Sequence, residues 1–270
     1  MKLDYSKKWY LHLIYYRLVK LYRFFKNIFF ARKDHIFLFI LSPPFCGSTL
    51  LNQILSTSKN LSCNNYLGVR EGQLLPEVKD IMFNNKGWDN HVSYPWSKIK
   101  RVWMEYWDQS KQILMDKSTT NIMRVQEIKD VFTNISFLAM VRNPYAQVEG
   151  IIRRNNSTAE YAAKFALKCL RYQRRNKEHY KDILFFSYED LCDNTEEVFE
   201  KIQKYIPELG KIKSNLKFSA HNYKTKNKMR IQNLNKEKIA MLSTEQLLVI
   251  NSYFKMEAEL LDYFGYSIIE

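Results

Sequence analysis

The chain has 270 residues, of which 46% are hydrophobic and 15% aromatic, so it can bury a sizeable core and disorder is excluded for most of it. Its 42 lysines and arginines exceed its 28 acidic residues by 14, which predicts an anionic partner; nucleic acid, phospholipid, sulfated glycan and nucleotide all fit this charge. The four cysteines lack zinc-like spacing, so reduced thiols are expected rather than a disulfide framework or a structural metal site.

Residues 1–34 are predicted to be a basic, aromatic N-terminal helix or extension ahead of a single domain over residues 35–270. Four cations interrupt the apolar run from Trp9 to Phe30: Arg17, Lys20, Arg23 and Lys26. Each would cost about 2.5 to 3.5 kcal/mol at a bilayer centre, so we expect neither a transmembrane helix nor a signal peptide. The expected location of the protein is therefore the cytoplasm. At about 100° per residue these cations define no single polar face, which favours packing on the domain over peripheral contact with an anionic membrane.

Three short apolar runs predict buried strands, at residues 36–41, 136–141 and 183–188. A helix is predicted to begin at Thr49, a second after Asn194 and Glu197 at capping-box spacing, and a third from Ser243 to about Phe264. Strands that alternate with helices indicate an α/β fold with a doubly wound parallel sheet. Ligands of such sheets bind at the carboxyl ends of the strands.

The loop Ser42–Leu50, which reads SPPFCGSTL, joins the first strand to its helix. Gly47 permits a tight turn, and the amides of Gly47, Ser48 and Thr49 would point toward an anion at the positive end of the helix dipole. An ordinary helix N-cap is the alternative interpretation. A triphosphate-hydrolysing loop would carry lysine after the glycine, where this chain has Ser48.

Arg142 follows the second predicted strand in the segment FLAMVRNP. A cation at the end of an apolar strand needs an anion, which is either a bound ligand or a structural carboxylate. The loop at Gly47 and this segment together resemble the sulfotransferases that use 3′-phosphoadenosine 5′-phosphosulfate (PAPS), in which an arginine grips the 3′-phosphate of the nucleotide.

Further segments extend the resemblance in the same order over residues 35–266, and they are most similar to tyrosylprotein and carbohydrate sulfotransferases. These segments are DKST (116–119), EGQLLP (71–76), FSYEDL (186–191) and FGY (264–266). The resemblance implies a P-loop-type three-layer fold with a central, mostly parallel sheet flanked by helices. It also implies transfer of a sulfuryl group from PAPS to an acceptor hydroxyl, without a metal.

The site residues follow from this resemblance. The leaving 5′-phosphate is assigned to the loop Cys46, Gly47, Ser48 and Thr49, the bridging oxygen or sulfonate to Lys117, and the 3′-phosphate to Arg142. Glu71 is the expected general base, with His91 and Glu77 in reserve. A late basic loop is expected near the phosphates, and Tyr188 near the adenine; the cations of that loop are Lys226, Lys228 and Arg230.

The chain departs from the family pattern at two positions. Phe45 stands where lysine or arginine is usual, and Gly150 stands where a serine is common. The missing contacts to the phosphates are expected to be replaced by Lys117, Arg153, Arg154 or the late basic segment. The alternatives are a small-molecule kinase on the same scaffold and a noncatalytic basic module, whereas no nucleic-acid motif occurs. A glycan is the first expected acceptor, a peptide tyrosine the second, and a small alcohol or lipid the third, with acceptor contacts among the aromatic residues of 61–107.

Overall fold

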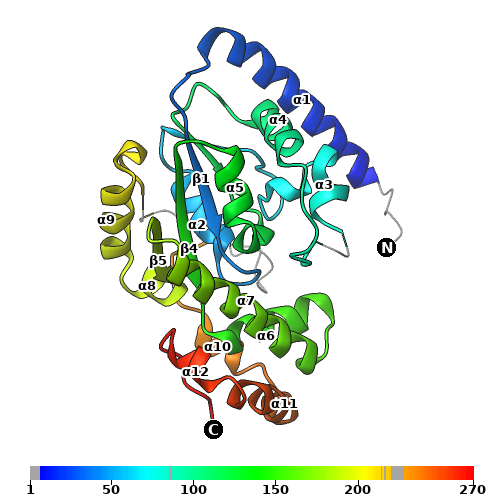
Figure 1. The fold of residues 1–270 in the computed structure, drawn as a ribbon, viewed down its shortest axis with the longest axis vertical. Coiled ribbons are helices and arrows are strands. Elements are labelled where there is room, and N and C mark those ends of the chain that lie inside the picture. The colour runs from blue at the N-terminus through cyan, green and yellow to red at the C-terminus, as the bar shows by residue number, and fades with distance from the viewer. Residues whose placement is uncertain (1–6, 85–86, 214, 216, 220–227) are drawn as a thin grey trace.

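The fold is built on a five-stranded sheet, seen in a computed structural model that describes residues 7–84, 87–213, 215, 217–219 and 228–270 (Figure 1). Every strand pair is parallel and the spatial order is β2-β3-β1-β4-β5. The strands are β1 (Ile36–Leu41), β2 (Leu61–Cys63), β3 (Ile113–Asp116), β4 (Ile135–Val141) and β5 (Ile183–Ser187). The predicted α/β class with a parallel sheet is therefore confirmed.

Strand β1 lies at the centre of the sheet and all six of its residues are buried. Its side chains alternate between two cores: Phe37, Phe39 and Leu41 pack with helices on one face, and Leu38 and Ile40 with helices on the other. An apolar run without polar alternation is what burial on both faces requires. The first core also contains residues of helices α3 (Pro76–Met82), α4 (Trp96–Tyr106), α5 (Val125–Val131) and α7 (Ala159–His179). The second contains residues of α2 (Ser48–Leu55), α8 (Tyr188–Asp193) and α9 (Thr195–Tyr205).

Helices precede, connect and follow the strands of this sheet. They are α1 (Lys7–Phe30), α2 (Ser48–Leu55), α3 (Pro76–Met82), α4 (Trp96–Tyr106), α5 (Val125–Val131), α6 (Pro144–Asn155), α7 (Ala159–His179), α8 (Tyr188–Asp193), α9 (Thr195–Tyr205), α10 (Asn235–Ile239), α11 (Thr244–Lys255) and α12 (Ala258–Asp262). Three 3₁₀ turns and a small antiparallel hairpin complete the list: Gly72–Leu74, Thr119–Met123, Pro207–Leu209, β6 (Phe218–Ser219) and β7 (Lys228–Met229).

One predicted helix cap and one predicted helix end need correction. Asn194 is the N-cap residue of α9, but its side chain makes no capping hydrogen bond. Ser243 and Gln246 do form a reciprocal capping box, yet the helix that they open ends at Lys255 and a separate α12 follows. The long C-terminal helix expected from apolar periodicity is therefore two helices.

Helix α1 packs beside α4 along the outer edge of the molecule (Figure 1). Lys20 pairs with Glu77 and Glu105 at 2.8 and 2.5 Å, and Arg23 and Lys26 both pair with Asp108 at 2.8 Å. The expectation that the cations of this helix share no face was wrong for these three, because all of them reach acids of the domain. The packing expected for the helix is present, while the domain division at residue 34 stays a prediction.

The aromatic residues of 61–107 mostly build the core. Trp96, Trp103, Tyr106 and Trp107 are buried, and Trp88 is half-buried. The four cysteines are free thiols, as expected, and Cys192 is the least buried of them. Among the described helices, none is both long and apolar enough to cross a bilayer.

Candidate active site

The loop after β1 enters helix α2 at Gly47, whose φ of 92° lies in the left-handed region. A Cβ at this position would lie 2.5 Å from Cδ2 of Tyr188, so the close approach also requires glycine. Ser48 and Thr49 form the first turn of α2, where backbone N–H groups have no preceding carbonyl to bond. The start of α2 is therefore suited to an anion.

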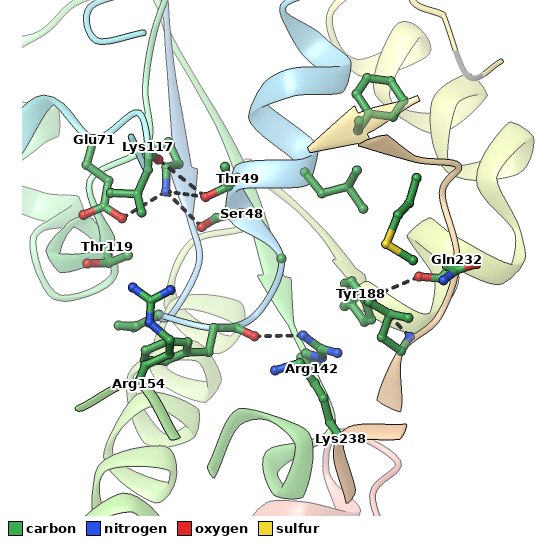
Figure 2. A pocket seen from close by; sticks show the side chains of 18 of the residues that line it. Ser48, Thr49, Glu71, Lys117, Thr119, Arg142, Arg154, Tyr188, Gln232 and Lys238 are labelled. Carbon is green, nitrogen blue, oxygen red and sulfur yellow. Dashed lines mark hydrogen bonds and ion pairs between the residues drawn. The ribbon is translucent and has the colours of Figure 1, made fainter. Parts of the chain in front are cut away.

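Lys117 lies at the carboxyl end of β3 and is almost fully buried. Its Nζ donates to Ser48 Oγ at 3.2 Å and to Thr49 Oγ1 at 3.3 Å, and it forms an ion pair with Glu71 Oε1 at 3.0 Å (Figure 2). All three ammonium protons thus have a partner. The loop itself contains no lysine, so the cation at the start of α2 is Lys117, which follows the neighbouring strand β3.

Asp116, which precedes Lys117, organises the surrounding loops although no role was predicted for it. Its carboxylate is fully buried and accepts five hydrogen bonds. The donors are Asn64 Nδ2, the Gly72 amide, the Ser118 amide, Ser118 Oγ and Asn121 Nδ2, at 2.8 to 3.1 Å. The bond to the Gly72 amide fixes the backbone directly after Glu71.

Glu71 is the predicted base, and it lines the same cavity as Lys117. Its Oε2 accepts from Gln73 Nε2 at 2.5 Å, while Oε1 faces Lys117. The two reserve bases lie elsewhere. Glu77 bonds to Lys20 and to Tyr106 between the helices, and His91 is an exposed residue that does not line the cavity.

Arg142 emerges from β4 opposite the start of α2 and is 4% exposed. Its Nε donates to Asn235 Oδ1 at 2.8 Å, its Nη1 donates to the Phe45 carbonyl at 3.0 Å, and its guanidinium lies 3.9 Å from the ring centroid of Tyr188. Its buried Nη2 has no hydrogen-bond partner among the described residues. Because an unpaired buried donor costs about 1 to 3 kcal/mol, this atom indicates a place for an anion.

Three polar residues around Arg142 were not predicted. Glu189 accepts hydrogen bonds from the Asn143 amide at 2.8 Å, from Tyr266 Oη at 3.2 Å and from Asn235 Nδ2. Burial and the carboxylate of Glu189 raise the pKa of Tyr266 well above its usual range, so its hydroxyl stays a donor. These contacts hold Asn235, and through it the orientation of Arg142.

Lys238 on α10 is a further cation that the sequence did not reveal. It is buried, and its Nζ lies 3.0 Å from Glu149 Oε2. Burial, together with the positive charge of Arg142, lowers the pKa of Lys238 to about 8. A short helix with three other polar residues carries no periodic signal that would have set this lysine apart.

The cavity between these groups has a volume of about 270 Å³. Among the described residues, Glu71 supplies the carboxylate of its lining. Six cationic side chains line the cavity as well: Lys117, Arg142, Arg153, Arg154, Arg230 and Lys238. Figure 2 shows Lys117, Glu71 and the start of α2 on one side and Arg142, Lys238 and Tyr188 on the other. A single ligand can therefore meet cations at two separated ends.

Most predicted binding residues line this cavity. They are Gly47, Ser48, Thr49, Arg142, Tyr188 and Arg230. Cys46 does not: burial raises the pKa of its thiol to about 12, and its amide donates to the Pro43 carbonyl at 3.4 Å. Lys228 is exposed on β7 and does not line the cavity, and Lys226 lies outside the described residues.

The two departures from the family pattern are in contact with each other. A Cβ at Gly150 would lie 2.9 Å from both Cβ and Cγ of Phe45. Phe45 itself has a positive φ of 66°, and its carbonyl accepts from Arg142. A side chain at position 150 is therefore excluded by the phenylalanine, while Arg153, Arg154 and Lys238 supply positive charge to the cavity.

Comparisons with known proteins bear on the family and the fold of the chain. The sequence profile of the Sulfotransferase family matches residues 38–207, whereas a search of curated proteins found no match. Among solved structures, the sulfotransferase domain of the olefin synthase of Synechococcus PCC 7002 is similar with a TM-score of 0.59 and 18% identity, over 88% of this chain and 98% of that one.

Two other solved structures share the fold. The sulfotransferase domain from the curacin biosynthetic pathway has a TM-score of 0.51 and 17% identity, over 88% of this chain and 100% of that one. A sulfotransferase from Alicyclobacillus acidocaldarius has a TM-score of 0.50 and 12% identity, over 88% and 97%. With the profile match spanning more than half of the residues, the resemblance seen in the sequence is confirmed, and the chain belongs to the sulfotransferase family.

Proposed function

We propose that this protein transfers a sulfuryl group from PAPS to an acceptor hydroxyl. The observation that carries the proposal is the unpaired, buried Nη2 of Arg142, a residue that lines the same cavity as the start of α2 and Lys117. A nucleotide with phosphates at both its 3′ and 5′ positions matches two cationic ends of one cavity. The arrangement thus fits PAPS better than a ligand with one charged end.

The donor would be held by residues that follow four strands, β1, β3, β4 and β5. The amides of Gly47, Ser48 and Thr49 are assigned to the 5′-phosphosulfate end, with Lys117 beside them. Arg142 is assigned to the 3′-phosphate, and Tyr188 to the adenine side. When bound, PAPS supplies an activated sulfuryl group and a phosphate leaving group; the residues position it and neutralise charge.

Glu71 is proposed as the general base that accepts the proton of the acceptor hydroxyl. It is the carboxylate of the described cavity lining, and it stands next to Lys117, where the sulfuryl group would lie. Each of its oxygens has a second lone pair free for an acceptor hydroxyl beyond the bonds to Lys117 and Gln73. These residues and a bound donor suffice for in-line transfer, and no metal is assigned to the site.

A glycan is the acceptor that we propose first, and a peptide tyrosine second. The support is the similarity of the motifs to carbohydrate and tyrosylprotein sulfotransferases. Stacking of sugar rings on the aromatic cluster gives no support, because its indoles and Tyr106 are largely used in the core.

We also propose that the N-terminal helix contacts a membrane surface, separately from the reaction.

The test of the donor is calorimetric titration with adenosine 3′,5′-bisphosphate. We expect binding by the wild-type protein and a loss of about 10- to 100-fold or more in Arg142→Ala, because a charged fork with 1.5 to 3 kcal/mol per hydrogen bond is removed. Arg142→Lys should recover part of the affinity, and Lys228→Ala, which changes an exposed cation outside the cavity, should leave it unchanged.

Absence of binding at tens of micromolar wild-type protein would contradict the proposal. Binding of ATP with magnesium in place of the bisphosphate would instead support the kinase alternative. If the bisphosphate binds, incubation with labelled PAPS and panels of glycans, peptides and lipids identifies the acceptor by which of them gains the label.

A further inference from the structure

Helix α1 turns its apolar side away from the domain. Twelve large hydrophobic side chains of this helix are exposed, and we call them the outer face of α1: Tyr10, Leu11, Ile14, Tyr15, Leu18, Leu21, Tyr22, Phe24, Phe25, Ile28, Phe29 and Phe30. Their exposed fractions run from 36% at Tyr15 to 76% at Phe29. A helix on a globular protein normally buries such residues, so α1 has the reverse orientation.

Ion pairs explain how the helix keeps this orientation. Lys20, Arg23 and Lys26 recur every three residues and reach acids on α3, on α4 and just after α4, as described above. Tyr16 is the buried aromatic residue on the same side, with its ring 5.9 Å from that of Tyr106. The polar side of α1 is thus fixed to the domain, and its apolar side chains are exposed. The helix itself runs along the edge of the molecule (Figure 1).

The shape of the outer face favours a lipid surface over another helix. At about 100° per residue, its members span about two thirds of the helix circumference, whereas the seam between two paired helices is narrower. The helix has 24 residues and is therefore about 36 Å long. Seven of the twelve side chains are tyrosine or phenylalanine, which are suited to the boundary between headgroups and acyl chains.

Charge favours the same partner. The protein carries a formal net charge of +14, so a second copy would be repelled, while an anionic bilayer would attract it. Arg32, just beyond α1, pairs with Asp34, whereas Arg17 on α1 and Lys33 just beyond it are further exposed cations. Their attraction would add to the burial of apolar surface.

We propose that the outer face of α1 docks the protein onto the surface of an anionic bilayer, with the helix axis parallel to the membrane. This inference goes beyond the sulfotransferase activity and does not depend on it. It also differs from binding through the cations of the helix, since three of these are paired within the protein and the apolar residues supply the contact.

The test is co-sedimentation of the full chain with vesicles of phosphatidylcholine containing phosphatidylserine. We expect wild-type protein to bind, and Leu18→Glu/Phe25→Glu to lower the partition coefficient by at least about tenfold, because two apolar contacts are lost and two negative charges are added. The matched control is Leu248→Gln/Met256→Gln, which changes residues that are 68% and 78% exposed outside α1 and should bind like wild type.

Urea unfolding of each variant checks that the fold is retained. In about 1 M NaCl, where the Debye length falls to about 3 Å, wild-type binding should weaken but persist. Wild-type protein that stays in the supernatant, or equal binding by the wild type and the α1 variant, would overturn the proposal. So would concentration-dependent dimerisation in sedimentation velocity that the α1 variant abolishes without any vesicle binding, since the face would then belong to a second copy.

Discussion

Gly150→Ser restores the serine that is common in the family, yet we expect it to damage this protein. The new Cβ would lie 2.9 Å from Cβ and Cγ of Phe45. These atoms are at the base of the phenylalanine side chain, so movement of a flexible side-chain end cannot relieve the contact. Phe45 must therefore move as a whole. Its carbonyl, which accepts from Arg142 Nη1 at 3.0 Å, would move with it.

The magnitude follows from two opposing effects. Overpacking of this kind costs about 1 to 3 kcal/mol, whereas replacing glycine inside helix α6 gains about 0.5 kcal/mol of helix propensity. The net loss in the free energy of unfolding should be about 0.5 to 2.5 kcal/mol. In a Phe45→Gly background both close contacts disappear, so Gly150→Ser should there be neutral or slightly stabilising.

A double-mutant cycle in urea measures this coupling, and calorimetric titration with adenosine 3′,5′-bisphosphate follows its effect on Arg142. We expect a coupling free energy of about 1 to 3 kcal/mol between the two positions, and weaker nucleotide binding in the single Gly150→Ser variant than in the double variant. If Gly150→Ser has the same cost in both backgrounds, within about 0.5 kcal/mol, the two departures from the family pattern are independent and the reasoning fails.

Two further predictions concern buried charges. Asp116→Asn should lower the free energy of unfolding by about 3 kcal/mol in urea and reduce turnover, because an amide cannot accept all five hydrogen bonds; the exposed Asp130→Asn is the control. Burial and the charge of Arg142 lower the pKa of Lys238 to about 8 in the folded protein, below its ordinary value of 10.5. This residue therefore makes stability rise with pH between those values, and bisphosphate affinity should fall as pH rises through about 8. Lys238→Met should remove both pH dependences, and unchanged profiles in urea and calorimetry would contradict this.

The parts of the site that could be predicted lie on long apolar strands or beside a glycine. The burial of β1 on both faces and the position of Arg142 after β4 follow from unbroken apolar runs, which have few alternative structures. Gly47 is needed for both a positive φ and a close approach to Tyr188, so the sequence marks the turn itself. Resemblance to a family added Lys117 and Glu71, whose local sequence alone has no strong signal.

The missed elements are those whose signal is short or whose environment is set by tertiary contacts. Strands β2 and β3 have three and four residues, too few to show a period, although Lys117 follows β3 directly. Lys238 and Asn235 lie on a five-residue helix and gain their role from Glu149 and Arg142, which are far away in sequence. No periodicity argument can find a residue whose function is defined by distant partners.

The positive charge of the chain illustrates how structure separates functions that composition leaves equal. Lys20, Arg23 and Lys26 have acidic partners within the protein, so they fasten α1 instead of facing a ligand. Lys117 and Arg142 instead lie at two sides of a cavity of about 270 Å³. The phosphates of a duplex are contacted along an extended surface, whereas these two cations lie around one cavity. The concentration of cations inside the cavity therefore favours a small bisphosphate ligand over nucleic acid.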